Sequence, residues 1–136
     1  MKIIAKVLLY GPKNQILLLQ RSNSHPYYAL QPDIPGGEVE RGETNNVAVA
    51  RELEEETGVS LPPSNFTQVH EQQVTQQKKY LIFQAAIKEF PKITLSWEHI
   101  NYSWGLVEDM LSVELPKDID NYYEMVIKYL SQTQSQ

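Results

Sequence analysis

The sequence contains no cysteine among its 136 residues, so disulfide bonds and thiolate zinc sites are excluded. Basic residues are also few, with 12 lysines and arginines against 17 aspartates and glutamates and a formal net charge of −5. Proteins that bind nucleic acid without sequence preference usually present a basic face. The charge balance therefore argues against a nucleic-acid partner.

Long apolar runs are missing as well. The stretch 1–10 is apolar but short, and Lys6 interrupts it. A membrane-spanning helix needs about 20 consecutive apolar residues, so we predict a strand here and neither a signal peptide nor a membrane span. We therefore expect a cytoplasmic protein that has no membrane partner.

The length favours one domain with its own core, and we place it at 1–131, followed by a polar C-terminal tail at 132–136. Turn chemistry at 11–14 predicts that the first two strands form a hairpin, and 21–35 is expected to be a loop. The whole pattern is of the α/β class. We expect helices at 45–57 and 118–130, and strands at 3–10, 16–19, 66–74, 79–87 and 102–107.

Carboxylates are concentrated on the first expected helix. Glu52, Glu55 and Glu56 stand at i, i+3 and i+4, so they share one helix face, whereas Glu54 points away. Three like charges on one face repel each other. A hard divalent cation such as Mg²⁺ or Mn²⁺ prefers carboxylate oxygens and would make the arrangement favourable.

The segment 37–59 resembles the Nudix box of the Nudix (MutT-like) hydrolases and fills every specified place of that pattern. The pattern is a glycine, five residues, a glutamate, seven residues and then Arg-Glu-aliphatic-x-Glu-Glu-x-Gly-aliphatic. The residues that fill it here are Gly37, Glu43, Arg51, Glu52, Leu53, Glu55, Glu56, Gly58 and Val59. A solvated acidic helix would explain neither the arginine nor the spaced glycines. The resemblance implies an α-β-α sandwich with a mixed β-sheet and hydrolysis of a phosphoanhydride bond.

Within the box we interpret Glu52, Glu55 and Glu56 as ligands of Mg²⁺ or Mn²⁺, with Glu55 also a catalytic candidate. The resemblance adds a backbone carbonyl of the Gly36–Gly37 pair, for which we choose Gly37. Two glycines let the backbone approach a metal closely, although they could instead form only a turn.

Glu43 precedes the helix and is expected to pair with Arg51. Both are candidates for the catalytic site, and we prefer a scaffold role to direct catalysis.

Our candidate for the general base lies outside the box, at Glu98. The segment 95–104 resembles the Glu-His-x-x-Tyr-x-Trp pattern of nucleoside triphosphate and dihydroneopterin triphosphate pyrophosphohydrolases. The alternative is that the three aromatic residues of this segment pack in the core and Glu98 is solvated. His99 is more typical of a structural hydrogen-bonding residue than of a base, and some relatives use a box glutamate as the base instead.

The segment before the box supplies substrate-binding candidates. Arg21 follows the second strand and either meets a phosphate or is a solvated surface residue. Tyr27 and Tyr28, near His25, either stack on a base or cover the sheet edge.

We therefore predict a metal-dependent hydrolase of a nucleoside triphosphate or of dihydroneopterin triphosphate, a small-molecule substrate. Nucleotide sugars, dinucleoside polyphosphates and a non-catalytic ligand sensor are the alternatives, and a homodimer is left open.

Overall fold

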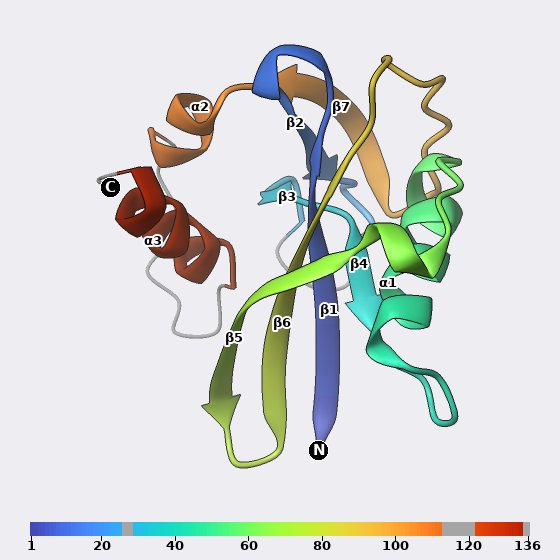
Figure 1. Ribbon diagram of the computed structural model, residues 1–136, viewed down its shortest axis with the longest axis vertical. Coiled ribbons are helices and arrows are strands. Elements are labelled where there is room, and N and C mark those ends of the chain that lie inside the picture. The colour runs from blue at the N-terminus through green and yellow to red at the C-terminus, as the bar shows by residue number, and fades with distance from the viewer. Residues whose placement is uncertain (26–28, 113–121, 135–136) are drawn as a thin grey trace.

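The computed structural model describes residues 1–25, 29–112 and 122–134 (Figure 1). In this part of the chain seven strands form one mixed sheet, and three α-helices lie against it. The strands are β1 (Lys2–Tyr10), β2 (Ile16–Arg21), β3 (Pro32–Asp33), β4 (Gly36–Glu38), β5 (Thr67–Thr75), β6 (Lys78–Ala86) and β7 (His99–Gly105). The helices are α1 (Asn45–Thr57), α2 (Val107–Leu111) and α3 (Tyr122–Gln134), and short 3-10 turns lie at Pro12–Asn14 and Pro63–Asn65.

Strand β1 runs through the centre of the sheet. It pairs in parallel with β6 along its whole length, from Lys2↔Lys78 to Tyr10↔Ala86, and β6 pairs with β5 as an antiparallel hairpin. On its other side β1 pairs antiparallel with the short strand β4, where Lys6 lies opposite Gly36. Strand β2 carries β3 and β7 as its antiparallel neighbours. This arrangement places the glycine pair of β4 beside the middle of the central strand.

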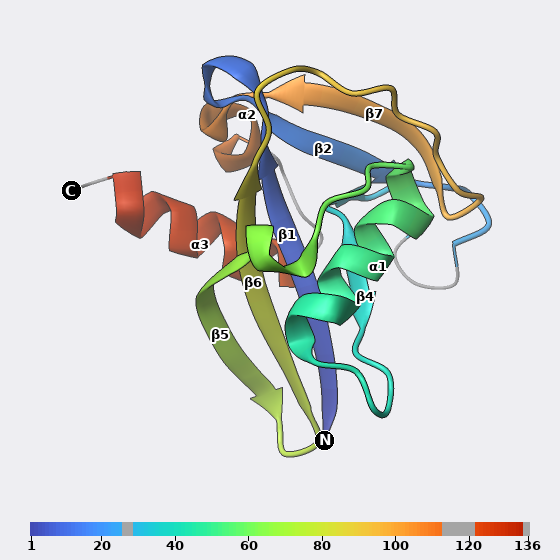
Figure 2. The same cartoon turned by 45° about the vertical axis from the view of Figure 1, so that its right-hand side comes forward.

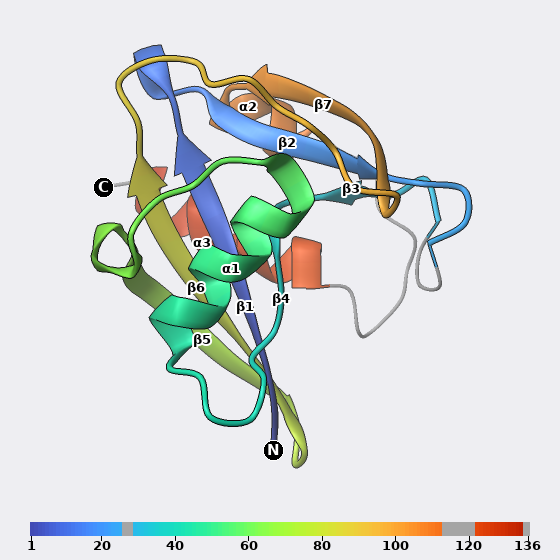
Figure 3. The same cartoon turned by 90° about the vertical axis from the view of Figure 1, so that its right-hand side faces the viewer.

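Each face of the sheet is covered by its own core. Side chains alternate along β1, so Ala5, Val7 and Leu9 pack with α1, whereas Leu8 packs with α2 and α3. Figure 3 shows α1 in front of the sheet and α3 behind it. The expected α-β-α sandwich with a mixed sheet is therefore confirmed. None of the helices in the described ranges is long and apolar enough to cross a membrane.

Several local predictions need correction. The expected hairpin of the first two strands is reduced to one pair, Tyr10↔Ile16, because β4 and the Pro35 carbonyl occupy the same edge of β1 from Ile4 to Val7. The expected loop 21–35 contains β3, and helix α2 was not predicted. Strand β7 begins earlier than the expected residue 102, at His99. The last helix continues to Gln134, and its expected first turn, 118–121, lies outside the described residues.

Candidate active site

Helix α1 carries the box carboxylates and has well-defined ends. The Thr44 hydroxyl accepts a hydrogen bond from the Val47 amide at 3.2 Å, which caps the first turn. Gly58 ends the helix in the left-handed conformation, with φ 78°, as its sequence position predicts. Val49 and Leu53 are buried against the sheet. Figure 2 shows α1 lying along β1 and β4, with its C-terminal end toward β7.

The glycine pair brings the backbone of β4 against this helix. Gly36 has a φ of 141°, and a side chain there would place its Cβ 2.1 Å from the Ala5 carbonyl oxygen. A Cβ on Gly37 would lie 2.5 Å from the carboxyl carbon of Glu52. The Gly36 amide donates to Glu56 Oε2 at 3.0 Å. The glycines thus lie in a strand in contact with two carboxylates, and the alternative that they merely form a turn is wrong.

The predicted pairing of Glu43 with Arg51 is confirmed. The Arg51 Nε and Nη2 groups donate to the two oxygens of Glu43 at 2.8 and 2.9 Å, and Nη1 donates to Glu52 and Glu55 at 3.0 and 3.1 Å. The hydrogen bonds from Arg51, and then the one from the Glu40 amide, lower the pKa of Glu43 to about 2. One guanidinium therefore joins the loop before α1 to the carboxylate face.

The three box carboxylates share one side of α1 but differ in exposure. The Glu55 side chain is 57% exposed, the Glu52 side chain 16%, and Glu56 only 4%. Burial raises the pKa of Glu56 well above its ordinary value and also raises that of Glu52. Across the described ranges no three histidine, aspartate or glutamate side chains already form a metal-binding cluster.

Arg51 explains this arrangement, because it holds Glu52 and Glu55 while Glu56 turns toward the Gly36 amide. The donor set nevertheless fits a hard divalent ion, since the Glu52 carboxylate lies against Gly37 and the Glu56 carboxylate against the Gly36 amide. The ligand roles of Glu52, Glu55, Glu56 and Gly37 stay predictions.

The Glu98 segment is attached to the C-terminal end of α1. The Thr94 amide donates to the Thr57 carbonyl at 2.8 Å, and the Ser96 amide donates to the Glu56 carbonyl at 3.2 Å. These two bonds satisfy carbonyl groups that a helix end leaves open. These bonds hold the segment that carries Glu98 against α1, which carries the candidate metal ligands.

Glu98 itself faces the same cavity as Glu56. Its carbonyl accepts from the Ser22 amide at 2.8 Å, and its Oε2 lies 3.6 Å from Nε2 of His25. Burial lowers the pKa of His25, and the positive charge of Arg21 lowers it further. The structure therefore brings Glu98 to the box, as a catalytic role would require, and the role itself stays a prediction.

The cavity has a volume of about 420 Å³ and lies between β1, β4 and the ends of α1 and α3. Both acidic and basic side chains line it. Its lining consists of Lys2, Ile4, Lys6, Arg21, His25, Asp33, Gly36, Gly37, Glu38, Glu56, Lys78, Tyr80, Glu98 and Tyr122. Arg21 is 8% exposed, so the alternative of a solvated surface arginine is wrong.

A buried charge cluster on the cavity wall was missed by the sequence analysis. Asp33 accepts from Lys6 at 3.0 Å and from the hydroxyl of Tyr122, and it lies 3.2 Å from Arg21 and 2.8 Å from His99. The Lys6 ammonium, with His99 and Arg21, holds the pKa of Asp33 well below its ordinary value against the opposing effect of burial. The structural role preferred for His99 is confirmed by its buried hydrogen bond.

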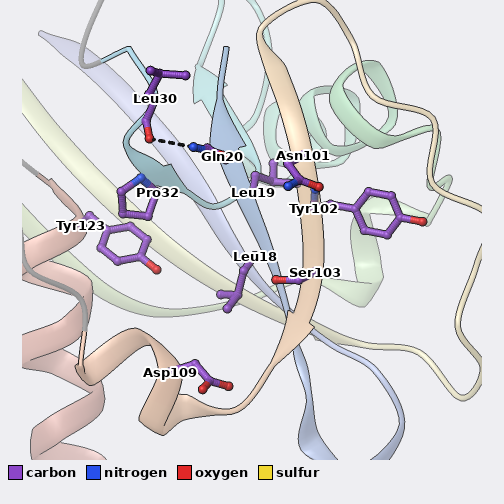
Figure 4. Close-up of a pocket in the computed structure, with 10 residues that line it drawn as sticks. All are labelled: Leu18, Leu19, Gln20, Leu30, Pro32, Asn101, Tyr102, Ser103, Asp109 and Tyr123. Atoms are coloured by element: carbon purple, nitrogen blue, oxygen red, sulfur yellow. Dashed lines mark hydrogen bonds between the residues drawn. The ribbon is translucent and has the colours of Figure 1, made fainter. Parts of the chain in front are cut away.

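Among the described residues, the aromatic candidates of segment 97–104 do not line this cavity. Tyr27 and Tyr28 lie outside the described residues. Trp104 packs against the core on the α1 side of the sheet, whereas Trp97 is 66% and Tyr102 43% exposed, so the three aromatic residues of this segment do not enter the core together. Tyr102 borders a separate cavity of about 320 Å³ on the β2–β7 surface, where its ring points away from the other lining residues (Figure 4).

Comparison with known proteins agrees with the box and the fold. A segment of 64 residues is 36% identical to the 8-oxo-dGTP diphosphatase of Escherichia coli (strain K12), and it covers 47% of this chain and 47%, about half, of that relative. The crystal structure of the MutT protein from Methanosarcina mazei Go1 is 31% identical, with a TM-score of 0.75 over 98% of this chain and 95% of that one.

The dihydroneopterin triphosphate pyrophosphohydrolase of E. coli shares the fold at 19% identity, with a TM-score of 0.65 over 93% of this chain and 95% of that one. The NUDIX domain matches residues 2–128, which is nearly the whole chain. The protein belongs to the NUDIX family.

Proposed function

We propose that this protein is a divalent-metal-dependent hydrolase that cleaves a phosphoanhydride bond of a nucleoside triphosphate or a related compound such as dihydroneopterin triphosphate. One observation carries the proposal: Glu56, the Gly36–Gly37 backbone, Glu98 and two buried cations, Lys6 and Arg21, all face one cavity. A polyphosphate needs such a mixture, because its metal ions bind carboxylates and its free oxygens bind cations.

Glu52, Glu55 and Glu56 would hold Mg²⁺ or Mn²⁺, together with the carbonyl of Gly37. When bound, such an ion neutralises phosphate charge and lowers the pKa of a coordinated water. Nη1 of Arg51 donates to Glu52 and Glu55 and would position these two carboxylates on the side of α1 where the ion would be held. Nε and Nη2 of the same guanidinium donate to Glu43, which attaches the loop before α1 to the helix.

Glu98 is the proposed general base that takes the proton of the attacking water. Its carboxylate borders the cavity, and the two backbone bonds from Thr94 and Ser96 fix its segment on α1. His25 lies beside Glu98 Oε2 and orients it. Glu55 is the competing base, since a box glutamate can serve in this role.

The test is a panel of substrates with Mg²⁺ and with Mn²⁺, and with identification of both products. The panel contains 8-oxo-dGTP, dATP, GTP, dihydroneopterin triphosphate, a nucleotide sugar and a dinucleoside tetraphosphate. We expect triphosphates to be converted to a monophosphate and pyrophosphate, with no conversion in EDTA. Hydrolysis in ¹⁸O-water locates the phosphorus that is attacked.

Two results would contradict the proposal in different ways. If only nucleotide sugars are cleaved, the triphosphate assignment is wrong and the hydrolase assignment stands. If Mn²⁺ binds saturably and no compound is converted, the domain is a ligand sensor.

A further inference from the structure

Lys6 is an unusual residue for the centre of a sheet. It lies on β1 between Ala5 and Val7, and it is only 6% exposed. Its Nζ donates to Asp33 Oδ1 at 3.0 Å and to the Ile34 carbonyl at 3.1 Å. Burying a lysine is costly unless its charge has a use or a partner, and the Lys6 side chain borders the candidate active-site cavity.

The partner of Lys6 is shared with a second cation. Asp33 also forms an ion pair with Arg21 at 3.2 Å, so a single carboxylate serves two buried positive groups. His99 adds a hydrogen bond to the same carboxylate, and its Nδ1 is buried without a hydrogen-bond partner in the described ranges. An ionised aspartate can only accept, so the imidazole Nε2–H is the donor of this bond. Lys6 and Arg21 thus bring two positive groups to one carboxylate.

The ammonium of Lys6 also has a donor to spare. An ammonium group carries three N–H donors, and within the described residues two oxygens accept from it. The ring of Tyr122 lies 4.7 Å from Nζ and contributes a weaker contact. A strong acceptor in the cavity would complete the coordination of Nζ.

Lys6 stands directly beside the carboxylates proposed to hold the metal. It is paired with Gly36 across the β1–β4 ladder, and its Cδ would be 2.8 Å from a Cβ on that glycine. The amide of Gly36 donates to Glu56 Oε2 at 3.0 Å, and Lys6 and Glu56 line the same cavity. A polyphosphate that reaches the metal ligands therefore passes within reach of Nζ.

We propose that Lys6 is a substrate-binding residue whose ammonium, anchored by Asp33, binds a phosphate oxygen that the metal ions leave free. The inference rests on the proposed function, which supplies the polyphosphate. Anchoring at Asp33 and Ile34 fixes the ammonium in advance, so little side-chain entropy is lost when the anion binds. A charged hydrogen bond of this kind contributes about 1.5–3 kcal/mol, equivalent to about 10–100-fold in affinity.

The test separates phosphate binding from chemistry. Inorganic tripolyphosphate is titrated calorimetrically into the metal-free protein in EDTA, with the wild type, Lys6→Met and Lys79→Met. Lys79 is a matched control, because it lies on the adjacent strand and pairs with the exposed Glu71. We expect Lys6→Met to weaken binding about 10–100-fold and Lys79→Met to leave it within about twofold.

Steady-state kinetics with Mg²⁺ give the second readout. Lys6→Met should raise KM for triphosphates more than it lowers kcat, because the contact exists before and during the reaction. Lys6→Arg, which keeps a cation, should restore part of the loss. Unchanged tripolyphosphate binding and KM in Lys6→Met, with only a lower melting temperature, would overturn the proposal and leave Lys6 as a partner of Asp33.

Other outcomes are equally decisive. If Lys6→Met keeps its affinity for tripolyphosphate but changes the preference among nucleobases, Lys6 contacts the base of the substrate and not its phosphates, and the proposal is wrong. If the wild type hydrolyses no nucleotide but its tripolyphosphate binding depends on Lys6, the proposed function fails and this inference stands.

If Lys6→Met does not fold, the test uses the ¹⁵N NMR signal of the Lys6 ammonium in the wild type. This signal is assigned by its disappearance in Lys6→Arg. It should shift when tripolyphosphate is added to the wild type, and a signal that stays in place contradicts the proposal.

Discussion

Two charge networks meet at the glycine pair of β4, and they are built in opposite ways. On the Gly37 side, the single guanidinium of Arg51 is shared by four carboxylates, those of Glu40, Glu43, Glu52 and Glu55. On the Gly36 side, the single carboxylate of Asp33 is shared by two cations. The first network is partly open to solvent, with the Arg51 side chain 24% exposed, whereas the Asp33 side chain is 2% exposed.

The two networks differ in the sign of their net charge. The Arg51 network has carboxylates in excess and favours a cation, and the Asp33 network has cations in excess and favours an anion. A metal-bound polyphosphate carries both kinds of charge. In the proposed function the two networks would complement opposite parts of one substrate, and each can be perturbed separately.

The largest expected effect lies between the networks, at Glu98. Glu98→Gln should lower kcat by about 10²–10⁴-fold if the carboxylate is the general base. Mn²⁺ affinity, measured by electron paramagnetic resonance, should change little. Glu89→Gln, an exposed glutamate on the preceding loop, is the control. A loss of less than about threefold with an unchanged pH–rate profile would move the base to the box.

The buried network should be the more important of the two for folding. Asp33→Asn leaves Lys6 and Arg21 without their carboxylate, and breaking a buried pair in this way costs about 3–5 kcal/mol. The free energy of unfolding is measured in urea. Glu71→Gln removes an exposed ion pair with Lys79 and should cost less than about 1 kcal/mol. Equal losses in the two variants would show that burial of Asp33 is unimportant.

The open network should instead govern metal binding. Replacing an outer partner of a metal site typically costs 10–100-fold, so loss of a direct ligand in Glu55→Gln should weaken Mn²⁺ binding at least about 100-fold and abolish most turnover. The melting temperature of the metal-free protein should stay the same or rise, because like-charge repulsion is relieved. Glu54→Gln, on the other side of α1, should behave as the wild type. Wild-type turnover by Glu55→Gln at saturating Mg²⁺ would defeat the ligand assignment.

A smaller effect on Mn²⁺ affinity is expected when the guanidinium of Arg51 is replaced by an ammonium. Arg51→Lys keeps the charge but loses the two-pronged contact with Glu43, so Mn²⁺ affinity should fall about tenfold. The exposed Arg41→Lys serves as the control. Identical Mn²⁺ affinity in the two variants would mean that charge alone matters at position 51.

The last prediction concerns the stability of the folded protein in acid, and its effect is absent at neutral pH. The pKa of Asp33 is lowered in the folded protein, so its contribution to stability is complete above the ordinary aspartate pKa of about 3.9 and is lost as pH falls through the lower folded value. Urea unfolding of the wild type should show this loss below about pH 4. The loss should be reduced in Asp33→Asn, and parallel profiles in the two proteins would assign it to other carboxylates.

The two networks also differ in what the sequence reveals. Glu52, Glu55 and Glu56 are close in the chain, so helical spacing predicts their common face, and Glu43 lies only eight positions before Arg51. Asp33 contacts Lys6, His99 and Tyr122 across 27, 66 and 89 positions. No local period connects such residues. The only sequence signal was the lysine inside an apolar strand, which predicts a strand but not its partner.

The attachment of residues 94–96 to the end of α1 has a consequence for changes in chain length. Because Thr94 and Ser96 are bonded to the carbonyls of Thr57 and Glu56, the position of Glu98 is set by α1 and not by the length of the connection after β6. Insertions at 88–92 should therefore leave the spacing between Glu98 and the carboxylates unchanged. A single insertion between Ser96 and Glu98 would displace the carboxylate by about one residue length, roughly 3.3 Å. Loop-length variation in this fold is thus tolerated on one side of the attachment and not on the other.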